Sequence, residues 1–203
     1  DTQLTPAALS LAVDSGLADG VTNDTTLIFN DQDGDATRVF LVDGVEHLEG
    51  YTPFTLDGSA DGVHTVSFTD TDAAGNVSVS QELSFTLDSQ IATPIITLLH
   101  DTGSSAADIM TNDGRLALAD IETDAKVEYS LDGAMNWSAN FSAIEGANGV
   151  DVRQTDAAGN VSGVSHLDFT LDTQLTPAAL SLAVDSGLAD GVTNDTTLIF
   201  NDQ

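Results

Sequence analysis

The 203-residue sequence contains no cysteine and few basic or aromatic residues, and each scarcity narrows the function. Without cysteine the chain has neither disulfides nor thiolate metal sites, so small domains need another source of stability. Only 4 Lys and Arg residues stand against 33 Asp and Glu residues, which gives a formal net charge of −29. A chain with so strong a negative charge cannot neutralise phosphates. This excludes nucleic acids as partners and argues against docking on anionic membranes.

Long apolar runs are also missing. No stretch of 18 apolar residues occurs and no charged-then-apolar leader opens the sequence. We therefore expect no membrane insertion in this segment and identify no signal peptide. Apolar residues nevertheless make up 41% of the chain and alternate with polar ones. Alternation is typical of half-buried strands and argues against the disorder that a high net charge otherwise favours.

The sequence is an array of similar units. The octapeptide Thr71-Asp-Ala-Ala-Gly-Asn-Val-Ser78 returns unchanged at 155–162, and residues 172–203 copy residues 1–32 without a change. Self-similarity at a fixed period indicates a repeat architecture. We divide the chain into a first unit (1–87), a second unit (88–171) and a partial third unit (172–203). We expect the native array to continue beyond them.

Short alternating segments predict strands in both full units. In the first unit they centre on the pairs Leu9/Leu11, Leu27/Phe29, Phe40/Val42, Val66/Phe68 and Phe85/Leu87. Asp43-Gly44 predicts a hairpin turn, and Asp132-Gly133 predicts its counterpart in the second unit, after Leu131 on an inward face. About seven short strands per unit are the signature of an immunoglobulin-like sandwich. The predicted fold class is all-β, with tandem immunoglobulin-like β-sandwich domains arranged as an extended rod.

The topology of such a sandwich brings acidic loops together at the joint between units. The first strand ends at the C-terminal pole, so the loop after it should meet the linker and the first pole of the second unit. The second unit contributes the octapeptide turn and the loop with Asp120, Glu122 and Asp124. Like charges at about 5 Å repel by roughly 1 kcal/mol even in water, so such a joint needs cations. Ligand sets made only of oxygen, in flexible geometry, favour Ca²⁺ over Mg²⁺.

The predicted calcium ligands form three groups related by the repeat. At the joint between the first and second units they are Asp14, Asp19, Asp24, Asp88, Gln90, Asp156 and Asn160. At the joint after the second unit they are Asp101, Asp108, Asp113, Asp172 and Gln174. At the N-terminal end they are Asp1, Asp70, Asp72 and Asn76, with Gln3 nearby.

These motifs resemble those of a known family. The Asp-Thr-Gln linker, the Asp-Ser-Gly and Thr-Asn-Asp loops, Tyr-Ser-Leu-Asp-Gly at 129–133 and the octapeptide resemble the tandem bacterial Ig-like extender repeats of giant adhesins. These are the RTX-type and biofilm-associated proteins secreted by type I systems of Gram-negative bacteria. The resemblance implies an extracellular segment that projects a distal ligand-binding domain from the cell surface, with calcium at the domain junctions. Neighbouring repeats are the implied partners, and the target of the distal domain is not specified.

Three alternative functions compete with this one. A binding module would contact a glycan, a surface or another copy through an exposed aromatic residue, for which Tyr51 and Trp137 are the candidates. An acidic halotolerant surface would bind no specific metal. An enzyme is disfavoured, because the four His residues do not recur at matched positions and no Gly-X-Ser-X-Gly motif occurs. The acidic run at 31–35 resembles the start of an EF-hand, but Val42 stands where that loop needs Glu.

Overall fold

The computed structural model describes residues 4, 8–30, 36–48, 54, 56, 58–175, 177, 179–186, 188–189 and 191–201. Within these ranges every regular element is a β-strand. Accordingly, the described part of the chain contains no helix capable of crossing a membrane. The acidic turn at 31–35, the candidate aromatic Tyr51, the predicted N-terminal ligand Asp1 and the nearby Gln3 lie outside the described residues.

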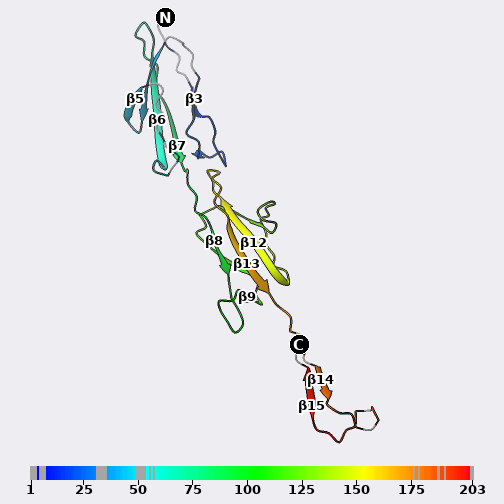
Figure 1. Ribbon diagram of the computed structural model, residues 1–203. Helices are drawn as coiled ribbons and strands as arrows, with labels where there is room; N and C mark the ends of the chain where they lie inside the picture. Colours follow the sequence, from blue (N-terminus) through cyan, green and yellow to red (C-terminus); the bar gives the residue numbers. More distant parts are fainter. Residues whose placement is uncertain are drawn as a thin grey trace.

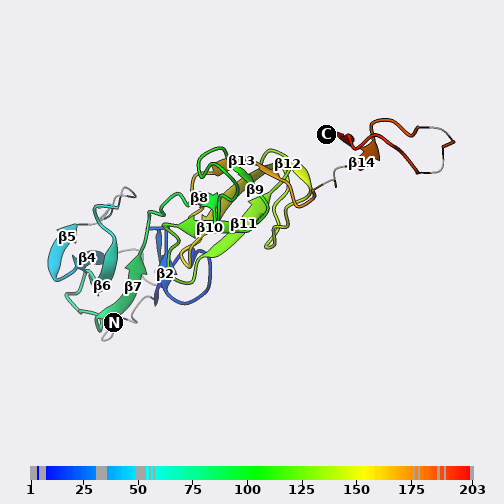
Figure 2. The same ribbon diagram turned by 90° about the horizontal axis from the view of Figure 1, so that it is seen from below.

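The first unit consists of two sheets packed face to face. Its strands are β1 (Ala8–Leu11), β2 (Val21–Thr22), β3 (Leu27–Asn30), β4 (Thr37–Val42), β5 (Val45–Leu48), β6 (Gly62–Thr71) and β7 (Gln81–Leu87). Strands β1 and β3 form a small antiparallel sheet, and β3 lies beside the larger sheet in Figure 1. The larger sheet has the order β2-β7-β6-β4-β5, and its strand labels follow this order in Figure 2. The alternation of apolar residues decides which faces meet. Leu9, Leu11 and Leu27 of the small sheet pack against a buried cluster that includes Val66 and Phe85.

The second unit repeats this arrangement. Its strands are β8 (Ile95–Leu98), β9 (Met110–Thr111), β10 (Leu116–Ala119), β11 (Lys126–Ser130), β12 (Gly146–Thr155) and β13 (Ser165–Leu171). Strands β8 and β10 pair with each other, and the larger sheet has the order β11-β12-β13-β9. Ile96 of the small sheet packs against Val150, Val152, Phe169 and Leu171 of the large sheet. The all-β sandwich predicted from alternation is therefore confirmed.

The partial third unit forms one hairpin-like pair, β14 (Ala179–Leu182) and β15 (Leu198–Asn201). Ala179 is opposite Asn201, in the same register as Ala8 opposite Asn30 in the first unit. Figures 1 and 2 show this pair beyond the C-terminal end of β13. Leu180 is 59% exposed, whereas its counterpart Leu9 packs on the core of the first unit.

Two local predictions can be compared directly with the structure. The Asp43-Gly44 turn is confirmed: both residues have positive φ angles, 51° and 78°, and they connect Val42 to its partner Val45. This geometry is that of the two-residue turn favoured in hairpins. The counterpart in the second unit was wrong. Residues 131–136 form a wider loop in which the Asp132 side chain accepts hydrogen bonds from both nitrogens of Asn136.

The wider loop has two consequences for the second unit. Leu131, predicted to face inward, is 63% exposed because β11 ends before it. The chain then returns alongside β11 only at a single bridge between Tyr129 and Ser138.

The short strands β2 and β9 were also not predicted. Each pairs in parallel with the last strand of its unit, so the first strand of each sandwich passes from one sheet to the other. Each of these two strands has only 2 residues, which is too few to show a hydrophobic period in the sequence.

Candidate metal centre at the joint

The loop after β1 contacts the turn after β12, as the strand directions predict (Figures 1 and 2). The Ser15 hydroxyl donates a hydrogen bond of 2.6 Å to the Ala158 carbonyl oxygen. The Leu17 amide donates a hydrogen bond of 3.2 Å to the Ala157 carbonyl oxygen. Ala158 has an exposed fraction of 0%. The two units are thus in direct contact through backbone groups of the octapeptide turn.

The turn is shaped by its own side chains. Asp156 accepts hydrogen bonds of 2.8 Å from the backbone and side-chain nitrogens of Asn160, and Gly159 has the positive φ of 86° that a tight turn requires. The Asn160 Nδ2 also donates to the backbone oxygen of Asp88 at 2.8 Å, and its Oδ1 accepts from Asn23 at 3.1 Å. Asn160 therefore connects the turn to both the linker and the first unit.

Three carboxylates meet beside this contact. One oxygen each from Asp88, Glu122 and Asp156 lie within 4.8 Å of one another, and all three residues are half-buried. Burial raises the pKa of the Asp88 carboxyl, and the nearby carboxylates of Asp156, Asp61 and Glu122 raise it further. Within the described ranges, none of the three clustered carboxylates forms an ion pair with Lys, Arg or His. We call these three residues the joint cluster.

The cluster draws its members from both sides of the joint. Asp88 directly follows β7, and its amide donates a hydrogen bond of 3.0 Å to the Thr22 carbonyl oxygen, so it is fixed to the first unit. Glu122 lies in the loop between β10 and β11, and Asp156 lies in the turn after β12. A ligand held by all three side chains would therefore connect the two units.

Gln154 of β12 positions the Glu122 loop. This fully buried side chain accepts a hydrogen bond from the Glu122 amide at 3.0 Å and donates to the carbonyl oxygens of Ala92 and Asp120 at 2.8 and 2.9 Å. The Glu122 carboxylate in turn accepts from the Ala92 amide at 3.0 Å. The sequence prediction placed Glu122 near the joint but left it out of the ligand set, and it missed Gln154. The available signal was a polar residue at an inward position of β12.

The joint cluster fits a hard divalent cation. Its donors are carboxylate oxygens only, a set that suits Ca²⁺ or Mg²⁺ rather than softer metals. Each oxygen of Asp156 accepts one hydrogen bond and so keeps a lone pair for a further partner. Mutual repulsion in a half-buried site leaves a positive ion as the natural complement. Asp88, Glu122 and Asp156 are the residues that would hold it.

The other ligands predicted for this joint lie outside the cluster. Four of them make local contacts that shape their own segments. Each of the three loop aspartates accepts a hydrogen bond from a nearby backbone amide: Asp14 from Gly20, Asp19 from Val21 and Asp24 from Thr26. The side-chain amide of Gln90 donates to the Ser89 carbonyl oxygen. Such side chain-to-backbone bonds are typical of Asp in turns. Asn160 acts as a structural contact through its amide group.

The ligands predicted for the second joint also make local contacts. Asp101 and Asp108 accept hydrogen bonds from the Ile109 and Met110 amides. Asp113 forms ion pairs with Arg115 and His100, and hydrogen bonds from these two side chains hold the pKa of its carboxyl well below the usual range. Asp172 and Gln174 follow β13, and the Gln174 amide donates to the Asp172 carboxylate at 3.2 Å. The structure does not gather these acids into a cluster like that of the first joint.

At the N-terminal end, Asp70 is buried in a two-fold contact with Arg38, at 2.7 and 2.8 Å. Asp72 accepts hydrogen bonds from the side chain and backbone of Asn76, and these lower the pKa of the Asp72 carboxyl. Asp70 therefore serves as a core counter-ion, while Asp72 and Asn76 reproduce the turn geometry of Asp156 and Asn160.

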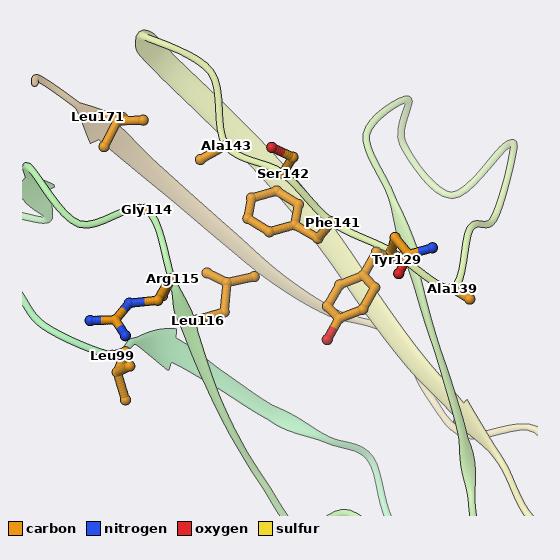
Figure 3. A pocket seen from close by; sticks show the side chains of 11 residues that line it. Leu99, Gly114, Arg115, Leu116, Tyr129, Ala139, Phe141, Ser142, Ala143 and Leu171 are labelled. Atoms are coloured by element: carbon orange, nitrogen blue, oxygen red, sulfur yellow. The ribbon is translucent and has the colours of Figure 1, made fainter.

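A separate pocket opens on the side of the second unit (Figure 3). Tyr129 and Phe141 line it, but both also pack against the core of the unit. Its one charged lining residue, Arg115, is paired with Asp113. The candidate aromatic Trp137 is also engaged, because the Arg153 guanidinium lies 4.2 Å from the centre of its ring. We therefore interpret this pocket as a place where the core of the second unit is incompletely covered, rather than as a glycan-binding site.

The comparison with family models agrees with the fold of the first unit. Residues 2–89 match the family model of the bacterial Ig-like domain. Among solved structures, the fibronectin(III)-like modules of CbhA from Clostridium thermocellum are similar at 12% identity and a TM-score of 0.42, over 84% of this chain and 97% of that one. A 1.5-MDa bacterial ice-binding adhesin is similar at 17% identity and a TM-score of 0.36, over 91% of this chain and 71% of that one. Curated proteins give no match.

The class of domain follows from the strand order and the family match. The chain is built from immunoglobulin-like β-sandwich domains, as the sequence predicts. The stretch that matches the bacterial Ig-like family model covers the first unit. The second unit has the same pairing of small and large sheets.

Proposed function

We propose that this chain is a structural extender segment of a large bacterial surface adhesin, in which Ca²⁺ at the joint cluster rigidifies the linker. In this function the stacked units form an extended rod that projects a distal ligand-binding domain for adhesion or biofilm formation. The segment would lie outside the cell, after type I secretion. Its partners would be the neighbouring repeats, and it would not be an enzyme. The bacterial Ig-like match of the first unit supports this class of protein.

The observation that carries the proposal is the joint cluster itself. Asp88 is fixed to the first unit, while Glu122 and Asp156 belong to the second, and their oxygens lie within 4.8 Å of one another. A bound cation would supply positive charge that connects the two sides. The hydrogen bonds of Ser15 and Leu17 orient the units at the same place. In an array whose repeats contact mainly their neighbours, the stiffness of the whole depends on such joints.

Without a cation, the same residues weaken the joint. Three half-buried carboxylates repel one another, and the pKa of the Asp88 carboxyl is raised first by burial and then by this repulsion. The other described contacts between the units include hydrogen bonds, each of which contributes about 1 kcal/mol net. The repulsion and the hydrogen bonding are therefore of similar size. In the proposed function, the bound ion decides whether the joint is closed.

Small-angle X-ray scattering tests this proposal. The chain is measured in excess CaCl₂ and in EGTA at matched ionic strength, and we expect a longer, stiffer particle with calcium. The double variant Asp88→Asn/Asp156→Asn should scatter alike in both solutions. Glu46→Gln removes one charge from an exposed position in β5 and should keep the wild-type response. Identical wild-type profiles with and without calcium would refute the proposal, and an equal effect of NaCl would favour a non-specific acidic surface.

A further inference from the structure

The linker after β7 begins as a continuation of that strand. The Asp88 amide donates to the Thr22 carbonyl oxygen at 3.0 Å. The next amide, that of Ser89, donates to the Asp61 carboxylate at 3.1 Å. Strand β7 lies between β2, which ends at Thr22, and β6, which begins directly after Asp61. Neighbouring amides of a strand point to opposite sides, so these two bonds extend both pairings of β7 into the linker.

The Ser89 hydroxyl adds to this contact. It donates to the same oxygen of Asp61 at 2.7 Å and accepts a hydrogen bond of 3.0 Å from the Gly58 amide. A Cβ on Gly58 would lie 2.7 Å from the Cγ of Gln90, so the linker lies directly against this loop of the first unit. The carboxylate takes the place of a strand carbonyl. We call the contact between Asp61 and Ser89 the first linker clamp.

The second unit holds the linker after β13 in the same way with different side chains. The Thr173 amide donates to both carboxylate oxygens of Glu145 at 3.2 Å, and the Thr173 hydroxyl donates to one of them at 2.7 Å. The preceding amide, that of Asp172, donates to the Thr111 carbonyl oxygen at 2.9 Å. Glu145 directly precedes β12, as Asp61 precedes β6. The pairing of an acid with a hydroxyl residue therefore recurs although both residues differ.

The second unit holds the far end of the first linker. The Ala92 amide donates to the Glu122 carboxylate at 3.0 Å, and the Ala92 carbonyl oxygen accepts a hydrogen bond of 2.8 Å from the buried Gln154 side chain. Pro94, two positions further on, is buried, and its carbonyl oxygen accepts a hydrogen bond from the Ser165 hydroxyl. The linker is therefore anchored to the second unit from Ala92 onward.

Only Gln90 and Ile91 lie between the two anchored ends of this extended segment (Figure 1). The hydrogen bonds of Gln90 stay within the linker, from its amide to Asp88 at 3.5 Å and from its side chain to the Ser89 carbonyl oxygen at 2.9 Å. Among the residues that the structure describes, none makes a hydrogen bond with Ile91. A backbone moves most easily where its amides are least held, so the joint has its weakest backbone restraint at these two residues.

We propose that Gln90 and Ile91 form the hinge of the first joint, and that the first linker clamp fixes where this hinge begins. The clamp is made within the first unit and involves no cation. It sets the direction in which the linker leaves that unit, whereas the joint cluster would set how freely the second unit moves about the hinge. The inference deepens the proposed function by naming the moving part of the joint, but the hinge and the clamp do not depend on calcium.

NMR relaxation of the ¹⁵N-labelled chain tests the hinge residue by residue. In EGTA we expect order parameters below about 0.6 at Gln90 and Ile91, and near about 0.85 at Ser89 and Ala92. Ser89→Ala changes no charge and removes the hydroxyl of the clamp. Position 89 should then become flexible as well, and its amide should exchange with solvent about fivefold faster. Thr173 is the internal reference, because this substitution leaves its clamp intact.

The double variant Asp61→Glu/Ser89→Thr copies the second clamp and should keep position 89 rigid. Uniform order parameters over residues 88–92 of the wild type in EGTA would overturn the hinge. A Ser89→Ala variant with the wild-type order parameter and exchange rate at position 89, or one that loosens Thr173 equally, would overturn the role of the clamp. The same measurement in excess CaCl₂ keeps the two proposals apart: unchanged flexibility at Gln90 and Ile91 there would contradict the calcium function and leave the hinge standing.

Discussion

Replacing Asp88 with Asn should change the stability of the joint in opposite directions with and without calcium. The substitution keeps the size of the side chain and removes one charge from the joint cluster, where the oxygens lie within 4.8 Å of one another. Two unit charges at that distance repel by about 0.9 kcal/mol in water and by about 3.5 kcal/mol at an effective dielectric constant near 20. Since the residues are half-exposed, we take the lower figure. Asp88→Asn removes two such pairs and should stabilise the calcium-free joint by about 2 kcal/mol.

With calcium the sign reverses. An ion at a thousandfold excess over its dissociation constant stabilises the folded state by about 4 kcal/mol. If losing one of three carboxylates weakens the site a hundredfold, about 2.7 kcal/mol of this is lost. The loss exceeds the roughly 2 kcal/mol that relief of repulsion contributes in the calcium-free chain, and that relief also shrinks when an ion already offsets the charges. Asp88→Asn should therefore lower the stability of the calcium-loaded chain.

Acid should imitate the substitution in the calcium-free chain. The pKa of Asp88 is raised in the folded state, first by burial and then by its acidic neighbours. A carboxyl of this kind favours folding when protonated, so stability rises as the pH falls through the raised pKa and is lost as the pH increases. In EGTA the wild type should therefore gain stability on mild acidification, and Asp88→Asn should gain less.

Thermal unfolding measures both signs. For a domain of this size a change of 1 kcal/mol moves the melting temperature by about 4–8 °C, so both effects are well above the noise. The exposed substitution Glu46→Gln makes the same charge change in β5, away from the joint. A shift of the same sign in CaCl₂ and EGTA would refute the reasoning. So would a Glu46→Gln variant that behaves like Asp88→Asn.

Three further predictions concern the groups around the joint and the core. Gly16→Ala should loosen the joint, because its Cβ would lie 2.0 Å from the Ala157 oxygen, and scattering should then show a more flexible particle. The control Gly20→Ala imposes a similar strain at positive φ, but its Cβ would meet nothing within 4 Å, so it should leave the joint unchanged. Gln154→Leu should cost about 1–3 kcal/mol by leaving the Glu122 amide and two carbonyls without a buried partner, and it should reduce the calcium-dependent rise in melting temperature. Arg38→Ala should destabilise the first unit by about 3–5 kcal/mol in denaturant titration, because Asp70 is left charged and buried, whereas Arg115→Ala at an exposed pair should leave the midpoint near that of the wild type.

Much of the fold could be predicted because sandwich strands show a period of two. Val66 and Phe68 alternate with polar residues in β6, and Val150 does the same in β12, so inward faces could be read directly from the sequence. Strand direction then fixed which loops share a pole, and the contact of Ser15 with Ala158 follows from that order. Which loops meet at a joint follows from the path of the chain alone, so it can be predicted without knowledge of side-chain conformations.

The ligand set could not be predicted to the same depth. Asp14 and Asp24 were predicted as ligands, and the structure places both outside the joint cluster, where each accepts a backbone hydrogen bond close by in the chain. An Asp that shapes a loop has the same sequence pattern as one that binds a cation, so the sequence does not tell which acids gather at the joint. Glu122 joins the cluster because buried Gln154 holds its loop, a contact between residues far apart in sequence. Its position depends on packing rather than on a local pattern.

The joint divides orientation and strength between two kinds of contact. Ser15 and Leu17 bond to backbone carbonyls of the turn, and these neutral contacts depend little on salt or pH. The joint cluster beside them is charged, and under the proposed function it would respond to cations. The octapeptide turn recurs unchanged, while the loop after the first strand of each unit varies in length between residues 14–24 and 101–113. The same orientation can therefore recur along an array, while the strength of each joint would depend on its carboxylates. In such an array the local cation concentration, rather than the sandwich cores, would control how stiffly each unit follows the one before it.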